Sequence, residues 1–120
     1  MAPADAKAFA QDWIEAFNAH DLERILRHYA PDVELVSPIY RSFTDRRADT
    51  VYGIAALRDY FGAALRRYPQ LRFTLLDVAT GVYSLCIRYH TNLGDRIAIE
   101  CLEHGIDGGI VRATCHYAEG

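Results

Sequence analysis

Apolar side chains recur at helical spacing near the start of the chain, with one interruption. An amphipathic helix is predicted over residues 4–19, where the apolar positions are Phe9, Trp13, Ile14 and Phe17. A second helix is predicted from Asp21, a favourable N-cap residue, to Pro31, because the residue before a proline is disfavoured in a helix. The break at residues 18–20 gives two short apolar faces at an angle, which one straight helix could not provide.

The pattern then changes from helical spacing to alternation. Residues 33–37 alternate between apolar and polar side chains and predict a strand that ends at Ser37. Residues 38–52 are polar and irregular and predict a long loop, which in a compact domain is usually functional or mobile. A third helix is predicted between Gly53 and Tyr68. Its apolar stripe consists of Leu57, Tyr60, Phe61 and Leu65.

The second half of the chain reads as strands separated by turns. These strands are predicted at residues 71–78, 82–91, 96–104 and 110–117. The connectors contain Gly, Asn and Asp, which favour tight turns, so successive strands are expected to pair antiparallel. The order of elements predicts one α+β domain, residues 1–120, with helices on one face of a strongly curved sheet.

The composition is that of an ordinary globular domain. With 51% hydrophobic and 24% charged residues among 120, the chain can bury a core without disulfides or metals. The net charge is −3 and the basic residues are scattered, so the sequence shows no basic patch of the kind that binds nucleic acid. No apolar run approaches the ~18 residues of a membrane span, and the N-terminus lacks a signal-peptide pattern, so we expect no membrane partner and a cytoplasmic location.

No motif for a metal or a cofactor is found in the sequence. The cysteines, Cys86, Cys101 and Cys115, are odd in number and widely spaced, which argues against a disulfide framework. No zinc spacing appears, and no glycine-rich phosphate loop follows a strand. His90 and His116 could approach each other across strands, but two histidines without a third ligand make a weak metal site. We therefore expect no metal and no cofactor.

Three stretches carry a resemblance to a known family. They are WIEAFNAHDLERILRHYAPDVELVSP, YGIAALRDYFGAALRRYPQLRF and AIECLEHGIDGGIVRATCHY. Through them, nearly the whole chain resembles the SnoaL-like branch of the nuclear transport factor 2-like superfamily, also described as ketosteroid isomerase-like or cystatin-like. The resemblance implies a cone-shaped, curved antiparallel sheet with three helices from the N-terminal half packed on its concave face. It also implies a pocket between helices and sheet, and a homodimer formed through the sheet's outer face.

The resemblance does not define a reaction, because the superfamily includes isomerases, cyclases, dehydratases, epoxide hydrolases and non-catalytic domains. Ketosteroid isomerases use an Asp base, with a Tyr and a protonated Asp as oxyanion donors. These positions fall on Ser37, Trp13 and near Leu102 here, and all three depart from the pattern. A serine hydroxyl cannot shuttle a proton unaided, and an indole can donate a hydrogen bond but cannot titrate. No run clearly supplies the Asp–Arg–Asp arrangement of limonene epoxide hydrolases.

Strand alternation assigns side chains to the two faces of the sheet. In the register that the resemblance suggests, the inner face carries Leu85, Ile87, Tyr89, Glu100, Leu102, His104, Val111, Ala113, Cys115 and Tyr117. The outer face carries Cys86, Arg88, His90, Ile97, Ile99, Cys101, Glu103, Arg112, Thr114 and His116. A slip by one residue would exchange the two sets.

Glu100 is the candidate catalytic residue, because it interrupts the apolar run 98–102 on the inner face. A carboxylate is seldom buried unless it is paired. Three alternatives are open. In the first, Glu100 is a structural residue that is hydrogen-bonded to Trp13, a tyrosine hydroxyl or an arginine. In the second, it is a general acid or base whose pKa is raised by the apolar walls of the pocket. In the third, its side chain is exposed to solvent.

The pocket is predicted to have apolar walls and a few polar tips, which suits a small hydrophobic or aromatic ligand. Besides Glu100, its predicted lining is Trp13, Phe17, Tyr29, Ser37, Tyr52, Tyr60, Tyr89, Leu102, His104 and Tyr117. Arg41, Arg46 and Arg47 belong either to a solvated loop or to a flap that meets an anionic group of the ligand. The predicted function is binding of a small hydrophobic molecule. The alternatives are a cofactor-independent isomerase, cyclase or hydrolase that uses Glu100, and a non-catalytic module that dimerises or docks a partner.

Overall fold

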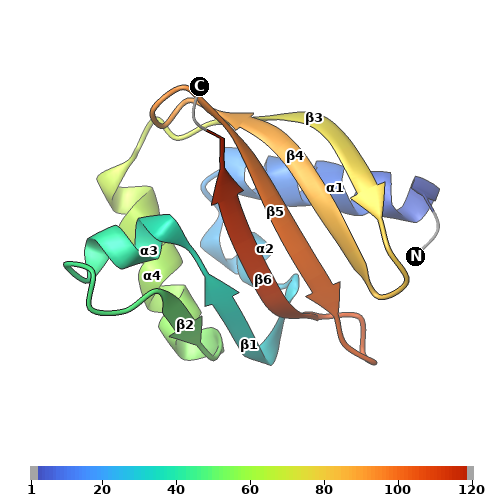
Figure 1. Ribbon diagram of the computed structural model, residues 1–120, viewed down its shortest axis with the longest axis horizontal. Helices are drawn as coiled ribbons and strands as arrows, with labels where there is room; N and C mark the ends of the chain where they lie inside the picture. Colours follow the sequence, from blue (N-terminus) through green and yellow to red (C-terminus); the bar gives the residue numbers. More distant parts are fainter. Residues whose placement is uncertain (1–2, 119–120) are drawn as a thin grey trace.

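The computed structural model describes residues 3–118, which form an α+β fold around one curved, open sheet (Figure 1). The helices are α1 (Pro3–Asn18), α2 (Leu22–Leu26), α3 (Pro38–Phe43) and α4 (Ile54–Arg67). The strands are β1 (Tyr29–Val36), β2 (Thr50–Tyr52), β3 (Phe73–Thr80), β4 (Ser84–Thr91), β5 (Arg96–His104) and β6 (Ile110–Tyr117). The predicted α+β class with a curved sheet is confirmed. None of the helices within residues 3–118 is both long and apolar enough to cross a membrane.

The strands lie in the order β2-β1-β6-β5-β4-β3. β3 to β6 form the antiparallel meander that the turn residues predict. β1, however, pairs in parallel with β6 and antiparallel with β2. The prediction of a wholly antiparallel sheet is therefore wrong at the β1–β6 pair. No turn joins these two strands, and an alternating pattern does not distinguish a parallel neighbour from an antiparallel one.

The second helix is shorter than the sequence pattern indicates. Asp21 is its N-cap, and the Asp21 carboxylate accepts a hydrogen bond from the Arg24 N–H at 3.1 Å. α2 nevertheless ends well before Pro31, and Tyr29 begins β1. Pro31 fits into the strand because the β1–β6 register shifts between Tyr29 and Glu34, and proline is tolerated at such irregularities.

Residues 38–52, predicted to be one irregular loop, contain α3 and the short strand β2. The Ser37 Oγ accepts a hydrogen bond from the Ile39 N–H at 3.2 Å, and Pro38 occupies the first turn of α3. Serine is a favourable N-cap and proline a favourable first helical residue. Ser37–Pro38 is therefore a helix start, and residues 3–118 contain four helices instead of the predicted three.

The core lies between the helices and the inner face of the sheet. α1 packs against β3, whereas α4 packs beside β1 and β2 (Figure 1). The fully buried side chains include Trp13 of α1, Leu57 of α4, and Leu85, Ile87 and Leu102 of β4 and β5. The burial of these strand residues agrees with the inner face assigned by alternation.

β6 departs from the predicted alternation at its start. The β5–β6 register shifts between Glu103 and His104. As a consequence Ile110 is fully buried, while Val111, predicted on the inner face, is only half-buried. From Ala113 onward the predicted inner face holds.

Asn18 joins the end of α1 to the start of β3. Its Nδ2 donates to the Phe73 carbonyl at 2.9 Å, and its Oδ1 accepts from the Phe73 N–H at 2.7 Å. We expect Asn18→Ala to lower the free energy of unfolding by about 1–3 kcal/mol, because both Phe73 backbone groups lose a partner in a partly buried place. Urea denaturation followed by circular dichroism measures this loss.

Asn92 provides the matched control, since it makes the same pair of contacts at an exposed place. Its Oδ1 accepts from the Arg72 N–H at 2.8 Å, and its Nδ2 donates to the Gln70 carbonyl at 2.7 Å. Water can replace the lost partner there, so Asn92→Ala should cost less than Asn18→Ala. A larger loss in the Asn92 variant would contradict this interpretation.

Candidate functional site

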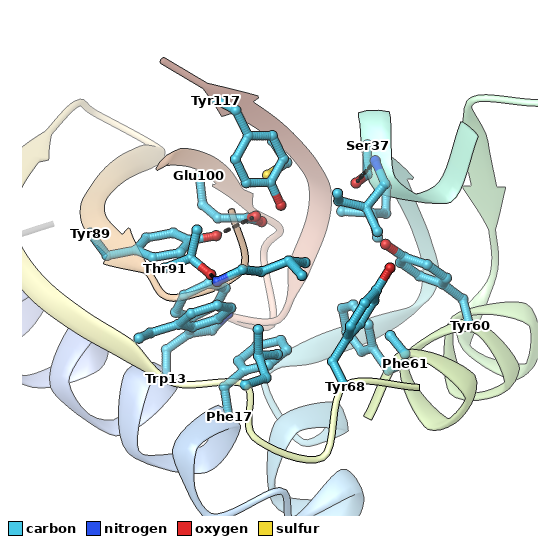
Figure 2. Close-up of a pocket in the computed structure, with 17 residues that line it drawn as sticks. Trp13, Phe17, Ser37, Tyr60, Phe61, Tyr68, Tyr89, Thr91, Glu100 and Tyr117 are labelled. Atoms are coloured by element: carbon cyan, nitrogen blue, oxygen red, sulfur yellow. Dashed lines mark hydrogen bonds between the residues drawn. The ribbon is translucent and has the colours of Figure 1, made fainter. Parts of the chain in front are cut away.

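A cavity lies between the helices and the inner face of the sheet (Figure 2). Its internal volume is about 60 Å³, and the space amounts to about 560 Å³ when the part open to solvent is included. The internal part alone has room for a few water molecules. An organic molecule bound there would therefore extend into the open mouth.

Trp13 of α1 is at the centre of the aromatic wall. Its ring centroid lies 4.7 Å from that of Phe17, 5.5 Å from that of Tyr89 and 5.9 Å from that of Phe73. Its Nε1–H donates to the Tyr29 Oη at 3.0 Å in the buried core. The indole thus contributes apolar surface to the cavity, and its one donor is already used.

Glu100 reaches the cavity from the middle of β5, and only 6% of it is exposed. The Tyr89 hydroxyl donates to the Glu100 Oε1 at 3.3 Å. None of the described residues that line the cavity is a lysine, arginine or histidine. Burial raises the pKa of Glu100, and hydrogen bonds from Cys115 and Tyr89 oppose this rise. Of the alternatives for Glu100, exposure is excluded, and the partner found is a tyrosine instead of Trp13 or an arginine.

Ser37 and Tyr60 bring hydroxyl groups to the cavity from the side opposite Glu100 (Figure 2). The Tyr60 ring packs against those of Tyr40 and Phe43, with centroids 5.1 and 5.5 Å apart. Burial raises the pKa of the Tyr60 hydroxyl, and a hydrogen bond with Ser37 opposes this in part. The Tyr60 hydroxyl therefore keeps its proton at neutral pH and can donate a hydrogen bond to a ligand.

The structure brings most of the predicted site residues together around this cavity. Those that line it are Trp13, Phe17, Ser37, Tyr60, Tyr89, Glu100 and Tyr117. They come from α1, α4, β4, β5, β6 and the residue before α3, so distant parts of the sequence meet at one place (Figure 2).

Four other predicted site residues are not part of this lining. Tyr52 is 67% exposed, because the alternation of β2 turns it away from the core. Tyr29 is buried as the acceptor for the indole N–H. Leu102 is fully buried in the core. His104 lies at the end of β5, where its ring packs against a phenylalanine of α1 with 5.0 Å between centroids.

The predicted lining omitted several residues that surround the cavity. They are Leu35, Ile39, Phe61, Ala64, Tyr68, Leu71, Phe73, Thr91, Leu93 and Cys115. Strand alternation could have found Phe73 and Thr91, which face each other across β3 and β4. Tyr68, Leu71 and Leu93 lie in connections between elements, where no periodic pattern indicates the direction of a side chain.

The arginines predicted as a flap or a solvated loop are Arg41, Arg46 and Arg47. All three are exposed, and none of them lines the cavity. Within residues 3–118, no group of three or more His, Cys, Asp or Glu side chains is placed to hold a metal ion.

Comparison with known proteins identifies similar sequences and folds. The sequence profile described as "SnoaL-like domain" matches residues 10–115. The crystal structure of a SnoaL-like protein of unknown function from Burkholderia thailandensis is 35% identical, with a TM-score of 0.91 and a match covering 99% of each chain. None of the curated proteins matches the sequence.

Two further crystal structures have the same fold at lower identity. A proposed ketosteroid isomerase from Kribbella flavida is 20% identical, with a TM-score of 0.74 over 98% of this chain and 81% of that one. A proposed polyketide cyclase from Sinorhizobium meliloti is 13% identical, with a TM-score of 0.75 over 97% of this chain and 100% of that one. These two similarities show the fold alone. The fold is the one described for solved structures as cystatin-like or nuclear transport factor 2-like. The profile match and the Burkholderia thailandensis relative show that the chain belongs to the SnoaL-like family.

Proposed function

We propose that this protein binds a small, largely hydrophobic organic molecule in the cavity between its helices and its sheet. The observation that carries the proposal is the carboxyl group of Glu100, which is buried and faces this space without a cationic partner among the described residues. Core packing alone does not call for such a group, because burial of a carboxyl costs free energy and the hydrogen bonds from Tyr89 and Cys115 offset only part of this cost. A ligand that hydrogen-bonds to Glu100 accounts for its presence.

The cavity wall indicates the chemical class of the ligand. Trp13, Phe17 and Phe73 offer apolar ring surfaces, which favour an aromatic or other planar apolar group. Glu100 and Tyr60 offer hydrogen bonds from two sides. A neutral group such as a phenolic hydroxyl can pair with Glu100, whereas a carboxylate at that depth would meet another carboxyl without a cation.

A second candidate function is a cofactor-independent isomerase, cyclase or hydrolase reaction with Glu100 as acid or base. The raised pKa of the buried Glu100 carboxyl favours it, because burial makes the group easier to protonate than an exposed carboxyl, as a general acid requires. No second carboxyl and no histidine lines the cavity among the described residues, so a partner for acid–base chemistry would have to come from the ligand or from water. Binding is therefore the function that the geometry supports best.

A module that only dimerises or docks a partner is supported less well than a ligand-binding domain. Such a module has no need for a cavity with a buried carboxyl and tyrosine hydroxyls. The homodimer through the outer sheet face and the cytoplasmic location stay predictions from the sequence.

The single tryptophan gives a direct readout, because Trp13 lines the cavity. We expect para-cresol, a small aromatic ring with one hydroxyl, to change the fluorescence of Trp13 in a saturable manner. Ala64→Phe should weaken this binding about tenfold or more, since Ala64 lines the cavity and the added ring would occupy it. The measurement is a fluorescence titration with excitation where tryptophan alone absorbs.

Ala56→Phe is the matched control, because Ala56 is exposed on the same helix and does not line the cavity. It should bind para-cresol like the wild type. A Trp13 signal that does not saturate, or equal affinities in the wild type and the Ala64 variant, would argue against a ligand site in the cavity.

A further inference from the structure

The mouth of the cavity continues into a groove between the end of α4 and the β4–β5 connection. The groove and the cavity share Tyr68, Leu71 and Leu93 in their walls, so the two spaces adjoin. The groove adds about 280 Å³. A ligand that enters the cavity can therefore extend along the groove.

Arg67 lines this groove, and its guanidinium group has no carboxylate partner among residues 3–118. Its Cζ lies 5.7 Å from the ring centroids of both Phe43 and Tyr68, and its Nε donates to the Tyr68 Oη at 3.2 Å. Arg58, on the same helix, is paired with Glu23, but no carboxylate in residues 3–118 forms an ion pair with Arg67. The aromatic contacts hold a positive charge beside the mouth, with its anion-binding capacity unused.

Arg96 places a second guanidinium against the wall of the cavity, although it lines neither the cavity nor the groove itself. Its Cζ lies 4.3 Å from the centroid of Tyr117, which lines the cavity. Arg96 is the cross-strand partner of Thr91, another lining residue, so the two side chains share the inner face of the sheet. The buried Nε–H of Arg96 finds no acceptor among the described residues. A buried donor without a partner is costly, and no group within residues 3–118 fixes this guanidinium through its Nε–H.

We propose that the mouth of the cavity, beside Arg67 and Arg96, binds a carboxylate at the outer end of the ligand. The ligand is then an amphiphile, with a neutral aromatic body beside Glu100 and an anionic end in the groove. This inference rests on the proposed function and goes further, because it names the chemical class and the orientation of the molecule. The separation of charges within the site supports this orientation. The Glu100 carboxyl lies deep in the cavity. The guanidinium groups of Arg67 and Arg96 lie against tyrosine rings of the mouth and the wall.

The test compares two probes that differ in the outer end only. They are para-hydroxyphenylpropionate and para-hydroxyphenylpropanol, and the Trp13 titration measures both. We expect the carboxylate to bind about tenfold more tightly than the alcohol at low salt, since charge-assisted hydrogen bonds are stronger than neutral ones. This advantage should shrink as the salt concentration rises.

Arg67→Gln and Arg96→Gln should each reduce the preference for the carboxylate severalfold and leave alcohol binding nearly unchanged. Arg67 is exposed, so its replacement tests the proposal even if Arg96→Gln impairs folding. Arg66→Gln is the matched control, because Arg66 is exposed on the same helix and lines neither the cavity nor the groove. The Arg66→Gln variant should keep the full preference for the carboxylate over the alcohol.

The outcomes separate this proposal from the function on which it rests. If the alcohol binds and the carboxylate has no advantage, or if the advantage survives in Arg67→Gln and in a folded Arg96→Gln, the anionic-end proposal is overturned and cavity binding stands. If neither probe nor para-cresol binds, the proposed function is overturned, and the anionic-end proposal with it.

Discussion

Replacing Trp13 by alanine should lower the free energy of unfolding by about 3–5 kcal/mol, as large-to-small changes of buried aromatic residues do. Trp13 is 1% exposed, and its ring packs against Phe17, Phe73 and Tyr89. The substitution removes these contacts and leaves a void next to an existing cavity. It also leaves the Tyr29 hydroxyl without its donor. Domains of this size are stable by about 5–15 kcal/mol, so a large share of the stability would be lost.

Two milder variants separate packing from hydrogen bonding at this position. Trp13→Phe keeps most of the apolar packing but loses the Nε1–H, and Tyr29→Phe removes only the hydroxyl that accepts from it. The second change should cost about 1–2 kcal/mol. Urea denaturation followed by circular dichroism is the measurement, because the chain has no other tryptophan to report unfolding by fluorescence. A loss below about 1 kcal/mol for Trp13→Ala would contradict the central place given to this side chain.

Replacing Glu100 by glutamine should make the protein more stable than the wild type at about pH 8, with no such gain at about pH 4. Burial raises the pKa of Glu100 in the folded state above its ordinary value. At a pH below the ordinary pKa of a glutamate, Glu100 is protonated in both the folded and the unfolded state, so the folded state keeps its full stability there. As the pH rises towards the raised pKa, the unfolded state releases its proton first, and the folded state loses stability relative to it. Glutamine does not titrate and avoids this loss.

The gain in stability of Glu100→Gln at high pH depends on the difference between the pKa of Glu100 in the folded state and in the unfolded state. Each unit of difference contributes about 1.4 kcal/mol to the gain at high pH. Glu103→Gln is the control, because Glu103 is exposed on the same strand. Urea denaturation over a range of pH measures both variants against the wild type. If the stability of Glu100→Gln runs parallel to that of the wild type at every pH, Glu100 is not held in the apolar environment described here.

Elements with a long, regular pattern were predictable from the sequence. The helical spacing of Trp13 and Phe17 predicted α1, and the alternation around Tyr89 and Glu100 predicted β4 and β5 together with their inner faces. The same alternation brought Tyr89 and Glu100 into one predicted site, and the structure places them within hydrogen-bonding distance. Periodicity is reliable here because each of these elements buries one face over its full length.

The errors lie where one local signal competes with another. Tyr29 fits the apolar stripe of a helix, but tertiary pairing with β6 makes it the first residue of a strand. Alternation predicts that Ser37 ends a strand, although Ser37–Pro38 is also the start of a helix. Pairing between β1 and β6 depends on packing across the whole domain and leaves no local trace.

The mouth of the cavity could not be predicted for a related reason. Tyr68 and Leu93 lie in connections, where side-chain directions depend on turn geometry and not on period. Arg67 follows a helical pattern as an exposed residue, and only the structure brings it against Phe43. Periodic patterns therefore predict much of the deep lining of the cavity, but not the residues at its mouth.

A crystal structure of the protein soaked with para-cresol tests the central claim most directly. We predict density for the ring inside the cavity, in contact with Trp13 and Phe73, with its hydroxyl within hydrogen-bonding distance of Glu100. Tyr68 at the mouth is the side chain expected to move when the ring enters. A cavity that stays free of para-cresol while the compound is found elsewhere, or a cavity closed by its own side chains, would contradict ligand binding at this site.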